Sequence, residues 1–185
     1  AGSRVLVQSG IHDEFVAEVV RRAESIRIGD PLADDTQMGP LATQAQRDRC
    51  ESVVAESAAQ GAMIHTGGCR PAGLESGWYY RPTVLGCPDQ KIRSTQVELF
   101  GPVMSVLLFD TEDQAVAMAN DTEFGLGAGI FTNDVARAHR SRGPNKRCRR
   151  GPAAAARRRA GDPGPRLPAG RLDRGGSPHG RAGIL

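Results

Sequence analysis

The composition of this chain changes abruptly near residue 140, and only the part before that point can build a hydrophobic core. Of the last 45 residues, 33 are Arg, Ala, Gly or Pro, and they include 11 Arg and 1 Lys against 2 Asp. Their net charge is +10, whereas residues 1–140 carry −7 and contain all eight aromatic residues. Such a segment buries too little apolar surface to offset the entropy lost on ordering. We therefore expect a folded domain of residues 1–140 and a disordered basic tail of residues 141–185.

Within residues 1–140, strand-type and helix-type segments alternate along the chain. Alternating or continuous apolar residues indicate strands at 4–8, 62–66, 78–85, 97–109 and 125–132. Helical periodicity begins near Ile11, after Thr43, after Thr111 and at Val135, with Asn133 or Asp134 as the cap of the last helix, which we expect to end at Arg140. Thr43 with Gln46, and Thr111 with Gln114, have capping-box spacing. The alternation predicts an α/β fold with a mostly parallel sheet and flanking helices.

Residues 97–103 (VELFGPV) contain the pattern that most clearly suggests a ligand site. In an extended segment, residues two apart project from the same face, so Glu98 and Phe100 can meet one ligand together. The carboxylate would accept hydrogen bonds from hydroxyl groups, and the ring would pack on a flat surface. Gly101 would let another backbone come close, and Pro102 would fix the start of the next strand. The alternative is a strand that begins with a solvated Glu98 and a core Phe100.

With four other stretches in the same order, this heptapeptide resembles the C-terminal part of the catalytic domain of NAD(P)-dependent aldehyde dehydrogenases. The other stretches are 1–4 (AGSR), 28–31 with 38–41 (IGDP and MGPL), 77–84 (GWYYRPTV), and 120–126 (NDTEFGL) followed by 131–132 (FT). The resemblance covers residues 1–140 and stops near Arg140. It implies a partial catalytic domain of this family.

The resemblance implies oxidation of an aldehyde to a carboxylic acid by NAD or NADP, through a cysteine thiohemiacetal and a thioester. In the family, the nucleophilic cysteine lies two positions before the residue that matches Ala1. The general-base glutamate, the oxyanion asparagine and the dinucleotide-binding half lie further upstream. We therefore expect no catalytic residue within this chain, and no activity from it alone. Glu98 matches the glutamate that binds the nicotinamide-side ribose, and Phe100 matches the aromatic residue near the nicotinamide.

The resemblance also implies a small aldehyde substrate and a homodimer or homotetramer. Four cysteines (Cys50, Cys69, Cys87 and Cys148) and four histidines show no metal-type or redox-type spacing, so no metal is expected. No apolar run of about 18 residues indicates a membrane span. Because no signal-peptide pattern opens the sequence, we expect a cytoplasmic location and free thiols.

For residues 141–185 three interpretations stay open. Arg, Gly, Pro and Ala have codons rich in G and C, so reading a GC-rich gene out of frame would give this mixture. A basic arm for nucleic acid or membrane surfaces is the functional alternative, although the tail has no aromatic residue for base stacking. A disordered tail could also bind polyanions through its charge alone. We expect no specific nucleic-acid binding. The whole chain is therefore part of an aldehyde dehydrogenase gene product, a non-catalytic remnant, or a basic-tailed binding protein.

Overall fold

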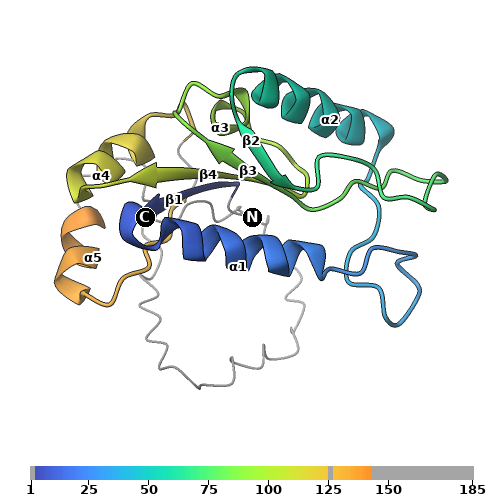
Figure 1. Cartoon of the computed structure of the whole chain (residues 1–185), viewed down its shortest axis with the longest axis horizontal. Helices are drawn as coiled ribbons and strands as arrows, with labels where there is room; N and C mark the ends of the chain where they lie inside the picture. Colours follow the sequence, from blue (N-terminus) through green and yellow to red (C-terminus); the bar gives the residue numbers. More distant parts are fainter. Residues whose placement is uncertain (1–2, 125–126, 143–185) are drawn as a thin grey trace, which may run out of the picture.

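The computed structural model of the protein describes residues 3–124 and 127–142 (Figure 1). The expected basic tail therefore lies outside the described residues, except for its first two positions. Four strands form one sheet in the order β1-β4-β3-β2. They are β1 (Arg4–Gln8), β2 (Met63–Thr66), β3 (Thr83–Cys87) and β4 (Val103–Phe109). β1 and β3 both pair in parallel with β4, and β2 pairs antiparallel with β3. The predicted mostly parallel sheet is confirmed.

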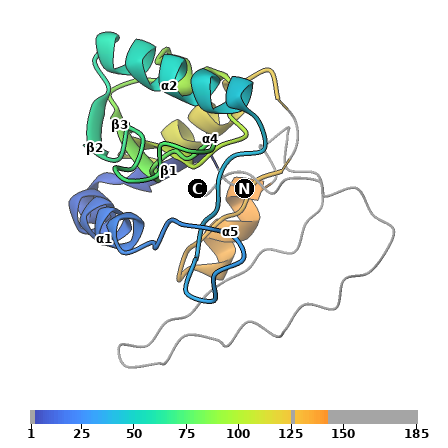
Figure 2. The ribbon, with the colours of Figure 1, turned by 90° about the vertical axis from the view of Figure 1, so that its right-hand side faces the viewer.

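Helices cover both faces of this sheet, as Figure 2 shows from the side. The helices are α1 (His12–Glu24), α2 (Gln44–Ala59), α3 (Arg93–Gln96), α4 (Glu112–Asn120) and α5 (Val135–Arg142), and a short 3₁₀ turn, Ser9–Ile11, joins β1 to α1. α1 lies on one face, whereas α2 lies on the other (Figure 2). The fold is thus a three-layer α/β arrangement, as the alternation of elements predicted.

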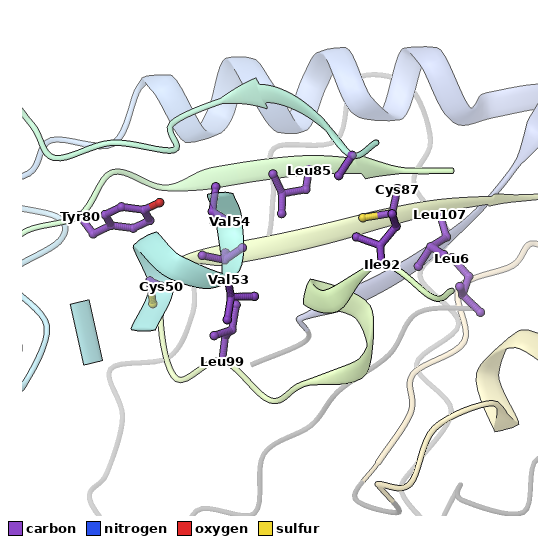
Figure 3. Packing of buried hydrophobic residues seen from close by; sticks show 12 residues of the cluster. Leu6, Cys50, Val53, Val54, Tyr80, Leu85, Cys87, Ile92, Leu99 and Leu107 are labelled. Atoms are coloured by element: carbon purple, nitrogen blue, oxygen red, sulfur yellow. The ribbon is translucent and has the colours of Figure 1, made fainter. Parts of the chain in front are cut away.

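Two hydrophobic clusters lie on the two faces of the sheet. Successive side chains of one strand belong to the two clusters alternately. In β1, Leu6 belongs to the cluster under α2, whereas Val5 and Val7 belong to the cluster under α1. Figure 3 shows the α2 cluster, which includes Cys50 from α2 and Leu107 from β4. Strands with both faces buried need apolar residues at nearly every position, which is why these segments read as continuous apolar runs.

The predicted helix caps are confirmed. The Thr43 hydroxyl accepts a hydrogen bond from the Gln46 amide at 3.2 Å, and Thr111 does the same for Gln114 at 3.2 Å. Asp134, one of the two residues expected to cap the last helix, accepts from the Arg137 amide at 3.0 Å. Each side chain satisfies a backbone donor that has no partner within its helix.

The buried face of α2 includes one polar residue. Cys50, Val53 and Val54 are buried, and Ser57 is fully buried beside them. The Ser57 hydroxyl donates to the Val53 carbonyl at 2.7 Å and accepts from the Ser94 amide at 3.0 Å. A hydroxyl with both roles filled is tolerated inside a protein, so a polar residue completes this face.

Several expected boundaries were wrong. Strand β3 begins at Thr83 rather than residue 78, and β4 begins at Val103 rather than residue 97. Of the described residues in the strand expected at 125–132, only Gly129 makes an isolated bridge. The last helix does not end at Arg140 but continues to Arg142, because Ser141 is buried and its hydroxyl donates to Glu112 of α4 at 3.0 Å. Packing, not local periodicity, decides the end of this helix.

Among the helices that the structure describes, none combines the length and apolarity that crossing a membrane requires.

Candidate functional site

The segment with Glu98 and Phe100 runs from the end of α3 to the start of β4. Leu99 is 7% exposed and packs in the α2 cluster near Cys50 and Val53 (Figure 3). Phe100 is 70% exposed, and Glu98 is half-buried. This alternation is what an extended segment gives when its middle residue points into the core. The alternative of a core Phe100 is therefore wrong.

Two side chains of α2 hold the backbone of this segment. Gln46 Nε2 donates to the Phe100 carbonyl, and Arg49 Nη2 donates to the Glu98 carbonyl at 3.5 Å. Gln46 and Arg49 are three residues apart, so both lie on the same side of the helix. The sequence analysis missed both residues, because it treated Gln46 only as part of a cap. No local signal identifies a side chain that contacts a carbonyl about fifty residues away.

Gly101 brings α2 against the end of the segment. A Cβ placed on Gly101 would overlap the Sγ of Cys50, which is fully buried. The close approach predicted at Gly101 is confirmed, but the neighbour is a side chain rather than another backbone. On the other side, the Pro102 carbonyl accepts a hydrogen bond from the Thr83 amide of β3 at 2.7 Å.

Helix α3 fixes the other end of the segment. The Ser94 hydroxyl accepts from the Ser105 hydroxyl at 2.9 Å, and the Ser94 amide donates to Ser57 of α2. The next residue, Thr95, donates through its hydroxyl to the Gln90 carbonyl at 2.8 Å. This four-residue helix was not predicted, because it is too short to show a periodic pattern. The backbone around Glu98 is thus held from α2, α3 and β3.

The two outward side chains of this segment have few competing interactions. The Glu98 carboxylate makes no hydrogen bond or ion pair with any residue that the structure describes. An ionised carboxylate is an acceptor for hydroxyl groups, and an exposed aromatic ring offers an apolar face to a flat group. A rigid backbone that presents these two groups side by side suits a ligand with both a sugar and a planar ring. Within the described part of the chain, no group of three or more His, Cys, Asp or Glu could hold a metal ion.

The two buried cysteines among the described residues do not have the environment of a nucleophile. Cys50 and Cys87 are buried, and burial raises the pKa of both thiols. A reactive cysteine needs the opposite shift, which comes from nearby positive charge or a helix N-terminus. Cys69 is exposed, and Cys148 lies outside the described residues.

The structure brings the matched stretches into contact with one another. The Leu41 amide of the second stretch donates to the Trp78 carbonyl of the third at 2.9 Å. Thr83 of the third stretch donates to Pro102 in the heptapeptide, as described above. Arg4 of the first stretch donates to the Asp121 carbonyl within the last stretch and to the Ala119 carbonyl just before it. Contacts between residues far apart in sequence therefore join the second and third stretches to the heptapeptide, and the first stretch to the last.

Comparison with known proteins gives a consistent result. The model of the aldehyde dehydrogenase family matches residues 1–145. A betaine aldehyde dehydrogenase of Mesorhizobium japonicum is 49% identical over 141 residues, which are 75% of this chain and 29% of that protein. A betaine aldehyde dehydrogenase of Cereibacter sphaeroides is 45% identical over 139 residues, 75% of this chain and 28% of that protein. The chain thus spans less than a third of the length of these relatives.

Solved structures show the same similarity. A betaine aldehyde dehydrogenase of Staphylococcus aureus in complex with NAD+ has a TM-score of 0.74 and 39% identity, over 76% of this chain and 28% of that one. The protein PnpE in complex with nicotinamide adenine dinucleotide has a TM-score of 0.77 and 39% identity, over 80% of this chain and 30% of that one. The similarity therefore extends from the sequence to the backbone fold.

Proposed function

This chain belongs to the aldehyde dehydrogenase family, and we propose that the protein of which it forms part oxidises a small aldehyde to a carboxylic acid with NAD(P)+. The observation that carries this proposal is the pair Glu98 and Phe100. Both side chains point away from the buried Leu99, and the Glu98 carboxylate has no partner among the described residues. The pair lies in a family motif, and similar proteins are known in complex with NAD+.

In this proposal the residues of the chain bind and orient the cofactor. Glu98 accepts a hydrogen bond from the nicotinamide-side ribose, and Phe100 packs near the nicotinamide ring. Gln46 and Arg49 keep the backbone beneath them fixed through their contacts with the two carbonyls. When bound, NAD(P)+ supplies the hydride acceptor. Holding the acceptor in one orientation lowers the entropic part of the barrier.

The nucleophilic cysteine belongs, in this proposal, to a segment that precedes residue 1. Such a cysteine would attack the aldehyde carbonyl, and a glutamate-activated water would release the acid from the thioester. Neither described buried thiol substitutes for it, since burial raises the pKa of Cys50 and of Cys87. We infer that the 185 residues alone do not catalyse the reaction. A homodimer or homotetramer in the cytoplasm, with no specific nucleic-acid or membrane partner, completes the proposal.

We also propose that the residues after the family match are read out of frame. The match ends at residue 145, five residues after the break expected from composition, and α5 is helical to Arg142. Sequencing the DNA from before codon 1 to beyond codon 185, and reading all forward frames, tests this. In the family, a Gly-x-Val-Trp-(Val/Ile)-Asn strand and a Pro-Phe-Gly-Gly segment follow this last helix. A second frame that encodes both supports a damaged or wrongly read gene. An intact single frame would overturn the proposal for the tail.

The activity test uses the full-length gene product that contains these residues, with betaine aldehyde as the first substrate because the similar proteins carry that name. Reduction of NAD+ or NADP+ that depends on aldehyde is the expected result. Glu98→Gln should raise the KM for the cofactor by about 10-fold, because a hydrogen bond to a charged group is lost. Glu14→Gln is the control, since Glu14 is exposed on α1 and far from this segment in the chain. A full-length product that oxidises no aldehyde with either cofactor would overturn the proposed function and favour a non-catalytic remnant.

A further inference from the structure

Arg4, the first residue of β1, joins three parts of the fold through one guanidinium group. Its Nη2 donates to the Ala119 carbonyl at 3.1 Å, and its Nη1 donates to the Asp121 carbonyl at 3.2 Å. Nη1 also donates to Gln90 Oε1 at 2.9 Å. The three partners lie 115, 117 and 86 residues further along the chain.

These contacts are chemically well matched. The last carbonyls of a helix have no partner within the helix and carry partial negative charge, and α4 ends at Asn120. A guanidinium presents five N–H donors in a rigid plane, so it can satisfy two carbonyls and an amide oxygen together. Lysine has a single ammonium group on a flexible stem and cannot reproduce this geometry. Arg4 therefore fixes where β1 begins relative to the end of α4.

Gln90 extends this contact to the segment with Glu98. Its side-chain nitrogen donates to the Asp121 carboxylate at 3.2 Å. Its backbone carbonyl accepts from the Thr95 hydroxyl at 2.8 Å and from the Gln96 side chain at 2.5 Å. Thr95 and Gln96 belong to α3, which ends two residues before Glu98. One residue thus contacts both the start of β1 and the helix that leads to Glu98.

We propose that Arg4 is a positioning residue, which sets the start of β1 relative to the segment that presents Glu98 and Phe100. The inference rests on the proposed function, in which the preceding segment carries the nucleophile and Glu98 holds the cofactor. The thiol and the hydride acceptor must then meet the same carbon atom of the aldehyde. An error of about 1 Å in such an arrangement can reduce the rate by about 100-fold.

The experiment measures the full-length gene product with Arg4→Met, Arg4→Lys and the control Arg27→Met. Arg27 also donates to a backbone carbonyl, that of Asp35 at 2.7 Å, but in an exposed loop outside this cluster. For Arg4→Met we expect kcat to fall by about 10- to 100-fold and the KM for NAD(P)+ to change by less than about 3-fold. Arg4→Lys should recover part of kcat, and Arg27→Met should leave kcat unchanged.

A second readout separates positioning from loss of stability. Alkylation of the nucleophilic thiol by iodoacetamide, followed against pH well below each variant's Tm, should be slower or shifted in Arg4→Met. If Arg4→Met is insoluble, Arg4→Lys and Gln90→Met are measured in its place. A lower kcat than the wild type in both variants then supports the inference. Unchanged kcat and alkylation with a lowered Tm would show a purely structural role and overturn it. A wild-type product without any aldehyde oxidation is a different result, because it removes the proposed function itself.

Discussion

The sulfur atom of Cys50 occupies the space that a side chain on Gly101 would need. Cys50 is fully buried on the inner face of α2, and Gly101 follows the exposed Phe100. The helix therefore approaches the segment as closely as a glycine allows. The hydrogen bond from Gln46 to the Phe100 carbonyl depends on the same close approach.

Gly101→Ala should destabilise the protein by about 1–3 kcal/mol, because an added methyl group must push α2 or the segment apart. Gly10→Ala is the matched control, since nothing lies within 4 Å of a Cβ at Gly10. Urea unfolding of each variant gives the free energies. Adding Cys50→Ala should recover part of the loss, so the double mutant should be more stable than the sum of the single effects. A double mutant whose destabilisation equals the sum of the two single effects would contradict the overlap between Cys50 and a side chain at position 101.

Iodoacetamide should label Cys69 quickly in the native protein, while Cys50 and Cys87 react only after unfolding. Burial raises the pKa of both buried thiols, so less thiolate is present at pH 8 than in a free cysteine. The measurement is mass spectrometry of labelled peptides in a Cys148→Ser background. Equal labelling of Cys50 and Cys69 in the native state would contradict this environment.

Tyr80→Phe should stabilise the protein by about 1 kcal/mol, because it removes a buried hydroxyl without a hydrogen-bond partner. The Tyr80 side chain is 1% exposed, and the nearby Thr83 hydroxyl already donates to the Arg81 carbonyl and accepts from the Gly68 amide. Urea unfolding checks the gain, with Tyr79→Phe as the control for removing a tyrosine hydroxyl.

The same substitution should change the behaviour at alkaline pH. Burial raises the pKa of Tyr80 above the value of about 10 for an unfolded tyrosine. The folded state therefore keeps its proton where the unfolded state releases it. The difference between the two pKa values has no effect on the free energy of unfolding below about pH 10, and it lowers that free energy as the pH rises above 10. Tyr80→Phe should show a smaller loss of stability between about pH 10 and 11 than the wild type. An equal loss of stability in Tyr80→Phe and in the wild type would contradict a Tyr80 phenol that stays protonated in the folded state.

Glu112→Gln should loosen α5 without unfolding the sheet. Glu112 accepts from the Ser141 hydroxyl at 3.0 Å and from Arg140 at 3.4 Å, and it forms an ion pair with Arg137 at 3.8 Å, so one carboxylate contacts three residues of α5. Losing the charge should weaken this docking by about 1 kcal/mol and speed amide exchange in α5 by about 5-fold. Asp113→Asn, in the same first turn of α4, is the control for the lost charge. If the α5 amides of Asp113→Asn exchanged as fast as those of Glu112→Gln, the effect would come from the lost charge in α4 and not from the contacts of Glu112 with α5.

Local features were predictable from the sequence, and long-range contacts were not. Thr43 and Thr111 act within three residues of their partners, so spacing alone identified both helix starts. The outward direction of Phe100 follows from an extended backbone around a buried Leu99. Helix α3 and the contacts of Gln46 and Arg4 depend on residues brought together only by folding. The end of α5 was misjudged for the same reason, since Ser141 is buried by α4 rather than by a periodic pattern.

The parallel pairing of β1 with β4 also sets an order of events during synthesis. Arg4 pairs opposite Ser105, so the partner of the first strand is made about 100 residues later. At ~5–20 residues per second, the ribosome needs roughly 5–20 s to supply it. During that time Val5, Leu6 and Val7 have no β4 to pair with, although α1 can already form beside them. The nascent chain therefore carries an unpaired apolar strand, a substrate for chaperones until β4 emerges.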